Sequence, residues 1–172
     1  LFDERKLNFI DGSWNIKSCT GNKFIKDINP TNINGLTKEK IISQINTLIN
    51  NYYSFMGYVE FSNYITRHTS SSDKELSDKV ALKIKIKKLK NIFNNRLIVI
   101  DEVQNIRIDN NNPNKKIAIN LMSLVKYVDN LRFLFLSATP MYNSYKEIIW
   151  LLNLMNLNDN RAKISIKDIF DE

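Results

Sequence analysis

Two adjacent carboxylates, Asp101 and Glu102, directly follow the aliphatic run Leu97–Ile100 in the stretch RLIVIDEVQNIR. An acid pair at the end of a buried strand suits nucleoside triphosphate chemistry, because one carboxylate can help to hold Mg²⁺ while the other orients and deprotonates an attacking water. The order of the acids predicts Asp101 as the metal-site residue and Glu102 as the catalytic base. The alternative interpretation is a strand that ends in polar residues, as most strands do, and the acid pair alone leaves both open.

A second apolar run, Leu131–Leu136, ends in three small residues, Ser137, Ala138 and Thr139. If its strand lies beside the first one, the two hydroxyl side chains can hydrogen-bond to the acid pair and report its state. The presence of both elements in one chain favours the chemical interpretation of the acids.

The elements that must position these residues follow an α/β order. Apolar residues at three- and four-residue steps predict helices over Ala81–Phe93 and Ile117–Val128, although alternating lysines in the first leave a strand as the alternative. Ser144 and Glu147 form a capping-box pattern, and an apolar stripe follows them. Strand, loop, helix, strand, turn and helix is the order of a parallel α/β unit, whose strands are buried on both faces and bind ligands at their carboxyl ends.

The N-terminal part of the chain shows weaker patterns. Leu1–Gly35 is predicted to be irregular, and an amphipathic helix is predicted to begin after an N-cap at Thr37 and to end near Gly57. Tyr58–Ile65 is predicted as a short alternating or mixed segment. The polar composition of residues 66–80 predicts a flexible loop.

Composition sets the broad class of the protein. A chain of 172 residues with 43% hydrophobic and 25% charged residues is suited to one globular domain. Cys19 and His68 are the only cysteine and histidine, which excludes an internal disulfide framework and a zinc site and favours a reducing compartment. No apolar run is long enough to cross a bilayer, and the first ten residues do not form a secretory signal, so neither a membrane nor secretion is expected.

The net charge of +7 favours a polyanionic partner. An AT-rich coding sequence would produce the same bias towards Asn, Lys and Ile, so charge alone is weak support. The lysines between Ala81 and Phe93 are interpreted as a solvated face rather than a phosphate track. The sequence does not identify the residues that would contact nucleic acid.

The stretch VIDEVQ followed by LFLSATP resembles motifs II and III of superfamily 2 helicases and translocases, whose motor domains are RecA-like. The continuation TPMYNSYKEIIWLLNLMN resembles the pattern of Swi/Snf-type motors. Three further stretches resemble the helicase-like ATPases of large cytoplasmic DNA viruses, whose relatives include the ATPase subunit of the poxvirus early transcription factor. These stretches are WNIKSCTGNKFIKDINPTNINGL, FMGYVEFSNYI and IIWLLNLMNLNDNRAKI, so the resemblance covers nearly the whole chain.

The resemblance implies a RecA-like parallel sheet flanked by helices, in which residues 1–172 form an incomplete first motor lobe. Asp101 and Glu102 would contact the nucleotide, with Asp101 at the Mg²⁺ and Glu102 as the catalytic base. Gln104 stands where many relatives have His and would also serve catalysis, by bridging to motif III without a titratable ring. Motif III, Ser137 to Thr139 with Ala138 between, would couple the nucleotide site to nucleic acid or to a second lobe.

The phosphate-cradling loop of such a motor ends in Gly-Lys-Ser/Thr, and none of the four glycines begins that pattern. The nearest candidate, CTGNKF at Cys19–Phe24, lacks it. The resemblance places this loop upstream of Leu1 and the second lobe downstream of Glu172. The segment alone is therefore expected to bind ATP poorly and to hydrolyse it negligibly.

The resulting expectation is part of an ATP-dependent helicase or DNA translocase that uses ATP and Mg²⁺ and serves viral transcription. Its partners would be nucleic acid, DNA rather than RNA, and subunits of a viral RNA polymerase or transcription factor, in the host cytoplasm or the virion. Two alternatives stay open at this point. One is a transcription initiation or termination subunit with accessory DNA-dependent ATPase activity, and the other is a non-enzymatic module that binds nucleic acid by charge.

Overall fold

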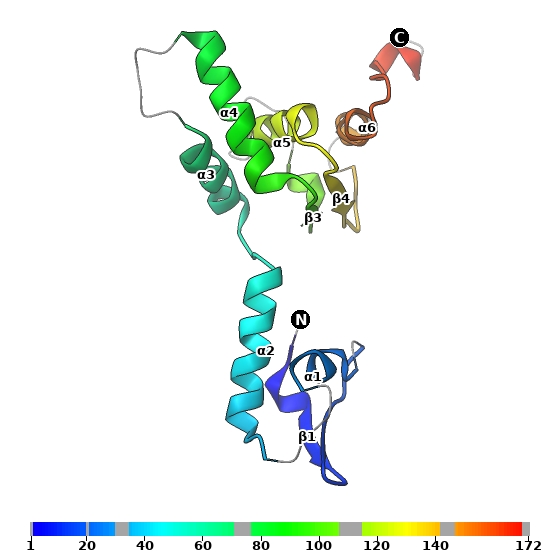
Figure 1. The fold of residues 1–172 in the computed structure, drawn as a ribbon. Coiled ribbons are helices and arrows are strands. Elements are labelled where there is room, and N and C mark those ends of the chain that lie inside the picture. The colour runs from blue at the N-terminus through cyan, green and yellow to red at the C-terminus, as the bar shows by residue number, and fades with distance from the viewer. Residues whose placement is uncertain are drawn as a thin grey trace. The chain divides into compact units, whose positions relative to one another are not determined.

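The computed structural model describes residues 2–19, 21–29, 35–70, 77–106, 115–141 and 147–169. The chain is mixed α/β and divides into two compact units, Leu1–Phe55 and Met56–Glu172 (Figure 1). The length of the chain predicts one domain, so this division is a difference from expectation. The assignment of all 172 residues to one motor lobe stays a prediction.

The first unit begins with a 3-10 turn, η1 (Glu4–Lys6), and an antiparallel hairpin of β1 (Leu7–Ile10) and β2 (Ser13–Ile16). The prediction of an irregular N-terminal stretch is therefore wrong for these residues. The missed signal is the dipeptide Asp11-Gly12, whose φ angles of 49° and 76° make the two-residue turn that joins antiparallel strands.

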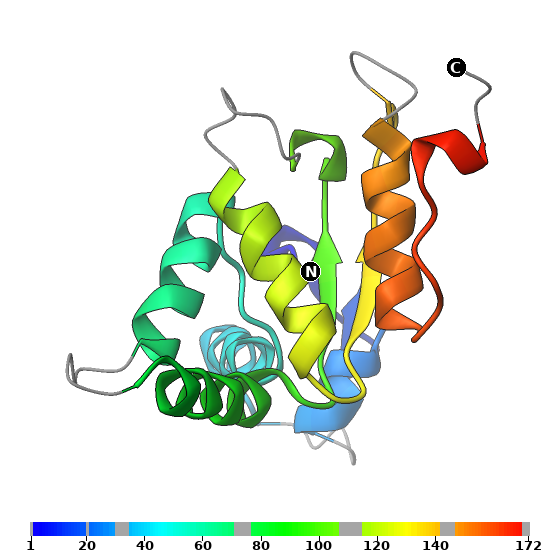
Figure 2. The same ribbon diagram turned by 90° about the horizontal axis from the view of Figure 1, so that it is seen from above.

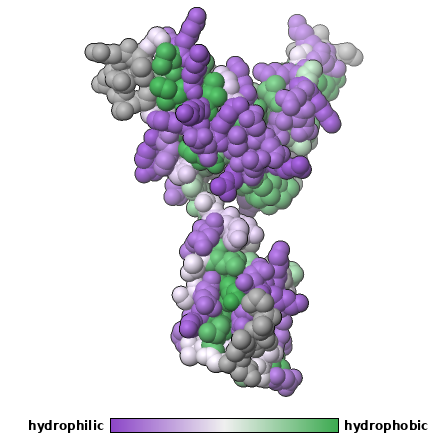
Figure 3. All heavy atoms as spheres, viewed as in Figure 1, coloured by the Kyte–Doolittle hydropathy of each residue, from purple (hydrophilic) through white to green (hydrophobic). Residues whose placement is uncertain are grey.

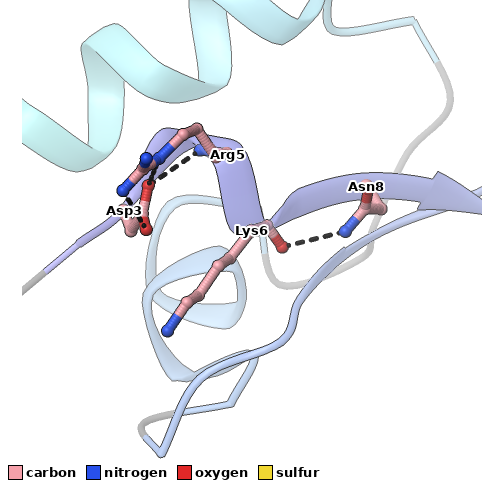
Figure 4. Close-up of polar contacts among 4 residues, drawn as sticks. All are labelled: Asp3, Arg5, Lys6 and Asn8. Carbon is pink, nitrogen blue, oxygen red and sulfur yellow. Dashed lines mark hydrogen bonds and ion pairs between the residues drawn. The ribbon is translucent and has the colours of Figure 1, made fainter.

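Local polar contacts shape the entry to this hairpin (Figure 4). The Asp3 carboxylate accepts hydrogen bonds from the backbone N–H of Arg5 at 3.1 Å and from its Nε at 3.0 Å. The hydrogen bond from the Arg5 side chain is the main cause that lowers the pKa of Asp3. Asn8 Nδ2 donates to the carbonyl of Lys6 at 3.1 Å, which ties the first strand residues to the turn before them.

Two helices complete the first unit, α1 (Lys23–Ile28) and α2 (Lys38–Tyr52). The predicted N-cap of α2 is confirmed, because the side chain of Thr37 accepts a hydrogen bond from the N–H of Lys40 at 3.4 Å. The helix ends at Tyr52, and Gly57 is the N-cap of the next helix, not part of this one. The core of the unit consists of Leu7, Ile16, Phe24, Ile25, Ile41, Ile45 and Ile49.

The second unit carries the two elements singled out by the sequence. Its elements are α3 (Tyr58–Thr69), α4 (Asp78–Phe93), β3 (Leu97–Ile100), η2 (Val103–Asn105), α5 (Lys115–Tyr127), β4 (Arg132–Phe135), α6 (Glu147–Asn158) and η3 (Ile166–Asp168). Strands β3 and β4 pair in parallel, with Leu97 opposite Arg132 and Ile100 opposite Phe135. The predicted order of strand, helix, strand and helix is confirmed, and Figure 2 shows α5 and α6 beside the strands.

The segment Tyr58–Ile65 is helical, so the prediction of an alternating or mixed segment is wrong. The buried face of α3 includes Ser62 and Thr69 next to Ile65, and small polar residues on this face hide the apolar period. Helix α4 confirms the helical interpretation of Ala81–Phe93 and begins at Asp78. The predicted loop over 66–80 is therefore shorter at both ends, and its residues 71–76 lie outside the described ones.

Two other predictions lie wholly or partly outside the described residues. Ser144 of the capping box belongs to residues 142–146, and most of the loop predicted before α5 belongs to 107–114. Helix α6 is described from Glu147, so the predicted capping box itself stays a prediction, and two members of the apolar stripe, Leu152 and Met155, are exposed.

The two faces of the β3–β4 pair differ. Ile98, Ile100, Phe133 and Phe135 turn towards the core that α3 to α6 build around Leu121 and Leu124. The opposite face is open: Leu97 is 60% exposed, Val99 52% and Leu134 48%. The prediction that both faces are buried is wrong for this unit, and hydrophobic patches interrupt its hydrophilic surface (Figure 3).

Candidate active site

The parallel pairing of β3 and β4 brings the acid pair and the Ser-Ala-Thr element to the same edge of the sheet. Leu136, directly after β4, donates its N–H to the carbonyl of Ile100 at 2.9 Å. Val103 then donates its N–H to the carbonyl of Leu136 at 3.1 Å. The chain that leaves β3 is thereby tied to the chain that leaves β4, which is the adjacency that the sequence analysis requires.

Asp101 and Glu102 form the turn between β3 and η2, and both side chains are exposed. Glu102 lies in the left-handed region, with φ of 53° and ψ of 45°. That conformation costs about 1–2 kcal/mol for a residue with an ordinary side chain. Such strain persists only where the surroundings hold it, and it is concentrated at functional sites. The Asp101 Oδ1 accepts a hydrogen bond from the N–H of Glu102 at 3.1 Å.

A line of hydrogen bonds connects the acids to the second motif. Gln104 donates through Nε2 to the Glu102 carboxylate oxygen Oε2. Ser137 donates through Oγ to the Gln104 Oε1 at 2.6 Å and accepts the N–H of Thr139 at 3.1 Å. The Gln104 amide thus uses its donor and its acceptor at once, as a bridge requires.

The structure therefore brings together most of the side chains that the sequence singles out. Glu102, Gln104 and Ser137 are joined directly, and Asp101 is in the same turn. Thr139 joins through its backbone N–H, whereas the motif predicts a role for its hydroxyl. Ala138 is exposed.

Sequence reasoning missed Tyr58, the first residue of α3. Its hydroxyl donates to the carbonyl of Asp101 and lies 3.0 Å from the carbonyl of Glu102. Burial raises the pKa of Tyr58, the charges of Asp101 and Glu102 add to that rise, and a hydrogen bond with Asn105 opposes it. The phenol is thereby kept as a neutral donor. Tyr58 precedes the acids by more than forty positions, and no pattern in its own segment indicates the contact.

The oxygen-rich composition of this edge fits a hard cation. The donors on offer are the two carboxylates, because the Gln104 amide and the Ser137 hydroxyl are bonded to each other. Mg²⁺ is commonly held by one or two carboxylates together with waters and substrate phosphates. The ion pairs within the described ranges are Arg5–Asp3 and Lys90–Asp129. Neither Asp101 nor Glu102 is therefore paired with a Lys or Arg of those ranges. The same ranges contain no cluster of three His, Cys, Asp or Glu side chains that could hold a metal ion.

A surface hollow of about 640 Å³ lies along α3 and has Tyr58 in its wall. Its other lining residues are Gly57, Val59, Glu60, Asn63 and Arg67. It does not contain the acids, so the hollow and the acid turn are separate features, and Tyr58 lines the first and contacts the second.

No protein-family model, curated protein or solved structure matches the chain. The resemblance to superfamily 2 motors thus stays a prediction. None of the helices in the described part of the chain is long and apolar enough to cross a bilayer, and Cys19 is exposed.

Proposed function

We propose that this chain is part of the first, RecA-like motor lobe of a nucleic-acid-dependent ATPase of superfamily 2, either a helicase or a DNA translocase. The observation that carries the proposal is the hydrogen-bonded line from Glu102 through Gln104 to Ser137, across the ends of two parallel strands. A strand whose polar end residues have no functional role would not require these hydrogen bonds between the two strand ends.

The roles follow from the positions of the side chains. Asp101 would hold the metal at the edge of the sheet, and Glu102 would orient the attacking water and accept its proton. When bound, ATP would supply the phosphoryl group and Mg²⁺ would neutralise charge on its phosphates. Gln104 keeps the Glu102 carboxylate aimed, because its Nε2 donates to Oε2 while Ser137 holds its other end.

The same line supports coupling between the nucleotide and the track. A change at Glu102 alters the hydrogen bond to Gln104, and Gln104 is bonded to Ser137 beyond β4. The segment after β4 would then move against nucleic acid or a second lobe. As part of this proposal the track is DNA, the further partners are transcription subunits of a large cytoplasmic DNA virus, and the location is the host cytoplasm or the virion.

Strain at Glu102 argues against the non-enzymatic alternative. A module that binds nucleic acid by charge alone has no use for a glutamate in the left-handed region, where Asn or Gly would be less costly. A functional demand on that carboxylate gives a reason for keeping it there.

The test is Glu102→Gln in the full-length protein that carries this segment. We expect steady-state ATP hydrolysis to fall by about 10²–10⁴-fold while ATP binding is retained, because the substitution removes the base and keeps the shape of the side chain. Glu4→Gln, at an exposed glutamate of the first unit, is the matched control and should leave turnover unchanged. Retained turnover in Glu102→Gln would refute the assigned role.

Assays on nucleic acid then separate the two kinds of motor. ATPase activity stimulated by duplex DNA without strand separation identifies a translocase. Strand separation on tailed duplexes identifies a helicase.

A further inference from the structure

We propose that Tyr58 is a second positioning residue of this site, beside Gln104: its hydroxyl holds the backbone of Glu102 in the conformation that aims the catalytic carboxylate. The proposal rests on the function proposed above. It adds a residue from α3, an element outside both motifs, to the machinery around the acids.

The argument begins with which atoms Tyr58 contacts. The carbonyls of Asp101 and Glu102 lie on the two sides of the Glu102 Cα, so their mutual direction is set by the φ and ψ angles of Glu102. In extended backbone, successive carbonyls point in opposite directions, and one donor does not reach both. In the helical regions of either hand, successive carbonyls point the same way. A single hydroxyl that reaches both therefore excludes extended backbone at Glu102 and favours a helical conformation such as the left-handed one that Glu102 adopts.

Other contacts of the turn hold single groups of the Glu102 backbone: its N–H donates to Asp101 Oδ1 at 3.1 Å, and its carbonyl accepts the N–H of Asn105 at 3.0 Å. The hydrogen bond from Val103 to Leu136 holds the chain after the acids, and Gln104 holds the Glu102 side chain. None of these contacts bridges the two carbonyls of the acid pair. Tyr58 thus supplies the contact that reaches both carbonyls flanking the Glu102 Cα.

Tyr58 is well placed to serve as a fixed point. It is half-buried, its ring packs against the core of the second unit, and it begins a helix whose Ser62 and Ile65 are buried. The raised pKa of its phenol, caused mainly by burial, supports a hydroxyl that stays protonated and able to donate.

The consequence is a specific defect in Tyr58→Phe, which removes one oxygen and keeps the ring. Without the donor, Glu102 relaxes towards ordinary backbone angles and its carboxylate turns away from the water that it must activate. In the full-length protein we expect kcat for ATP hydrolysis to fall about tenfold, with KM for ATP changed less than twofold, because Asp101 and the nucleotide contacts are retained.

Tyr64→Phe is the matched control, because Tyr64 lies on the same helix, is also half-buried and contacts Phe93 through its ring. It should leave both constants unchanged. A Tyr58→Phe enzyme with the turnover of the wild type, in a protein that Glu102→Gln inactivates, would overturn the positioning role while leaving the proposed function intact. Combining Tyr58→Phe with Glu102→Gln should cause no loss beyond that of Glu102→Gln alone.

A second measurement needs no ATPase activity and uses the 172-residue chain itself. By NMR, the Glu102 Cα and Cβ shifts should move from left-handed values towards extended ones in Tyr58→Phe. Amide exchange at Val103, whose N–H is bonded to Leu136, should accelerate about tenfold. Both readouts should match the wild type in Tyr64→Phe. Unchanged Glu102 shifts in Tyr58→Phe would sink the inference, whatever the outcome of the activity assays.

Discussion

The two ends of the β3–β4 pair use similar backbone geometry with different residues. At the amino ends, Asn95 and Asn130 are left-handed, with φ of 59° and 52°, and Asn130 Nδ2 donates to Asn95 Oδ1 at 2.7 Å. At the carboxyl end the left-handed residue is Glu102, with φ of 53°. Asn tolerates this region at little cost, whereas Glu does not.

Their charges differ as well. At the amino ends Asp129 is paired with Lys90 at 2.7 Å, and its backbone N–H is capped by the side chain of Asn94 at 3.0 Å. At the carboxyl end, Asp101 and Glu102 accept hydrogen bonds from neutral groups. The polar groups at the amino ends bond to one another and form a structural seam. The carboxyl end instead presents charge and backbone strain, which suit a ligand-binding site. Of the two polar clusters, the one at the carboxyl end is therefore the one to test for function, and four substitutions test this contrast.

The largest effect is expected from Asn95→Ala combined with Asn130→Ala. Alanine is less stable than asparagine in the left-handed conformation of both positions, and the hydrogen bond between the two side chains is lost. The free energy of unfolding should therefore fall by about 2–3 kcal/mol. Urea unfolding in a Trp14→Phe background lets Trp150 report on the second unit. Asn91→Ala, at an exposed helical position of α4, should not destabilise. A loss below about 0.5 kcal/mol in the double variant would contradict the structural role of this seam.

Ser137→Ala should have the next largest effect at the opposite end. It removes the donor to Gln104 and the acceptor for the Thr139 N–H, and a net cost of about 1 kcal/mol is expected for such partly buried bonds. The same unfolding assay measures it, with Ser123→Ala, whose hydroxyl bonds within its own helix, as the control. Full stability in Ser137→Ala would mean that the line from Glu102 to Ser137 is not formed in solution.

Glu102→Asn should raise stability by up to about 1 kcal/mol, because asparagine suits the left-handed region. In the full-length protein, the same substitution should abolish ATP hydrolysis, since the base is gone. A gain in stability with a loss of activity is the signature of strain kept for function. Destabilisation would instead show that the two ends do not differ in strain.

The smallest effect is expected from Asp129→Ala. Its partner Lys90 is partly exposed, and exposed ion pairs contribute about 0–1 kcal/mol, less at high salt. The loss should therefore be a few tenths of a kcal/mol and should vanish in about 1 M NaCl, in the same unfolding assay. A larger, salt-independent loss would mean that the carboxylate supports the seam by other contacts.

Much of this arrangement could be predicted from local patterns. The aliphatic runs and the Thr37 cap were sufficient to predict β3, β4 and α2, and the acids were predicted to stand at a strand end. The predictions failed where one sequence pattern is compatible with two different structures. Unbroken aliphatic residues in β3 predicted burial on both faces, but burial depends on what packs there, and Leu97 and Val99 face outwards in this unit.

The chemical groups of the site could be predicted from the amino-acid sequence: an acid pair, a glutamine two positions after its second acid, and a small hydroxyl motif after a second strand. These features depend on residue type and on short spacings along the chain, and both are visible in the sequence. The contact of Tyr58 with the acids and the left-handed conformation of Glu102 became evident from the folded chain alone. Both features depend on contact between distant segments, because a helix from earlier in the chain holds a backbone conformation that Glu102 would not adopt by its own preference.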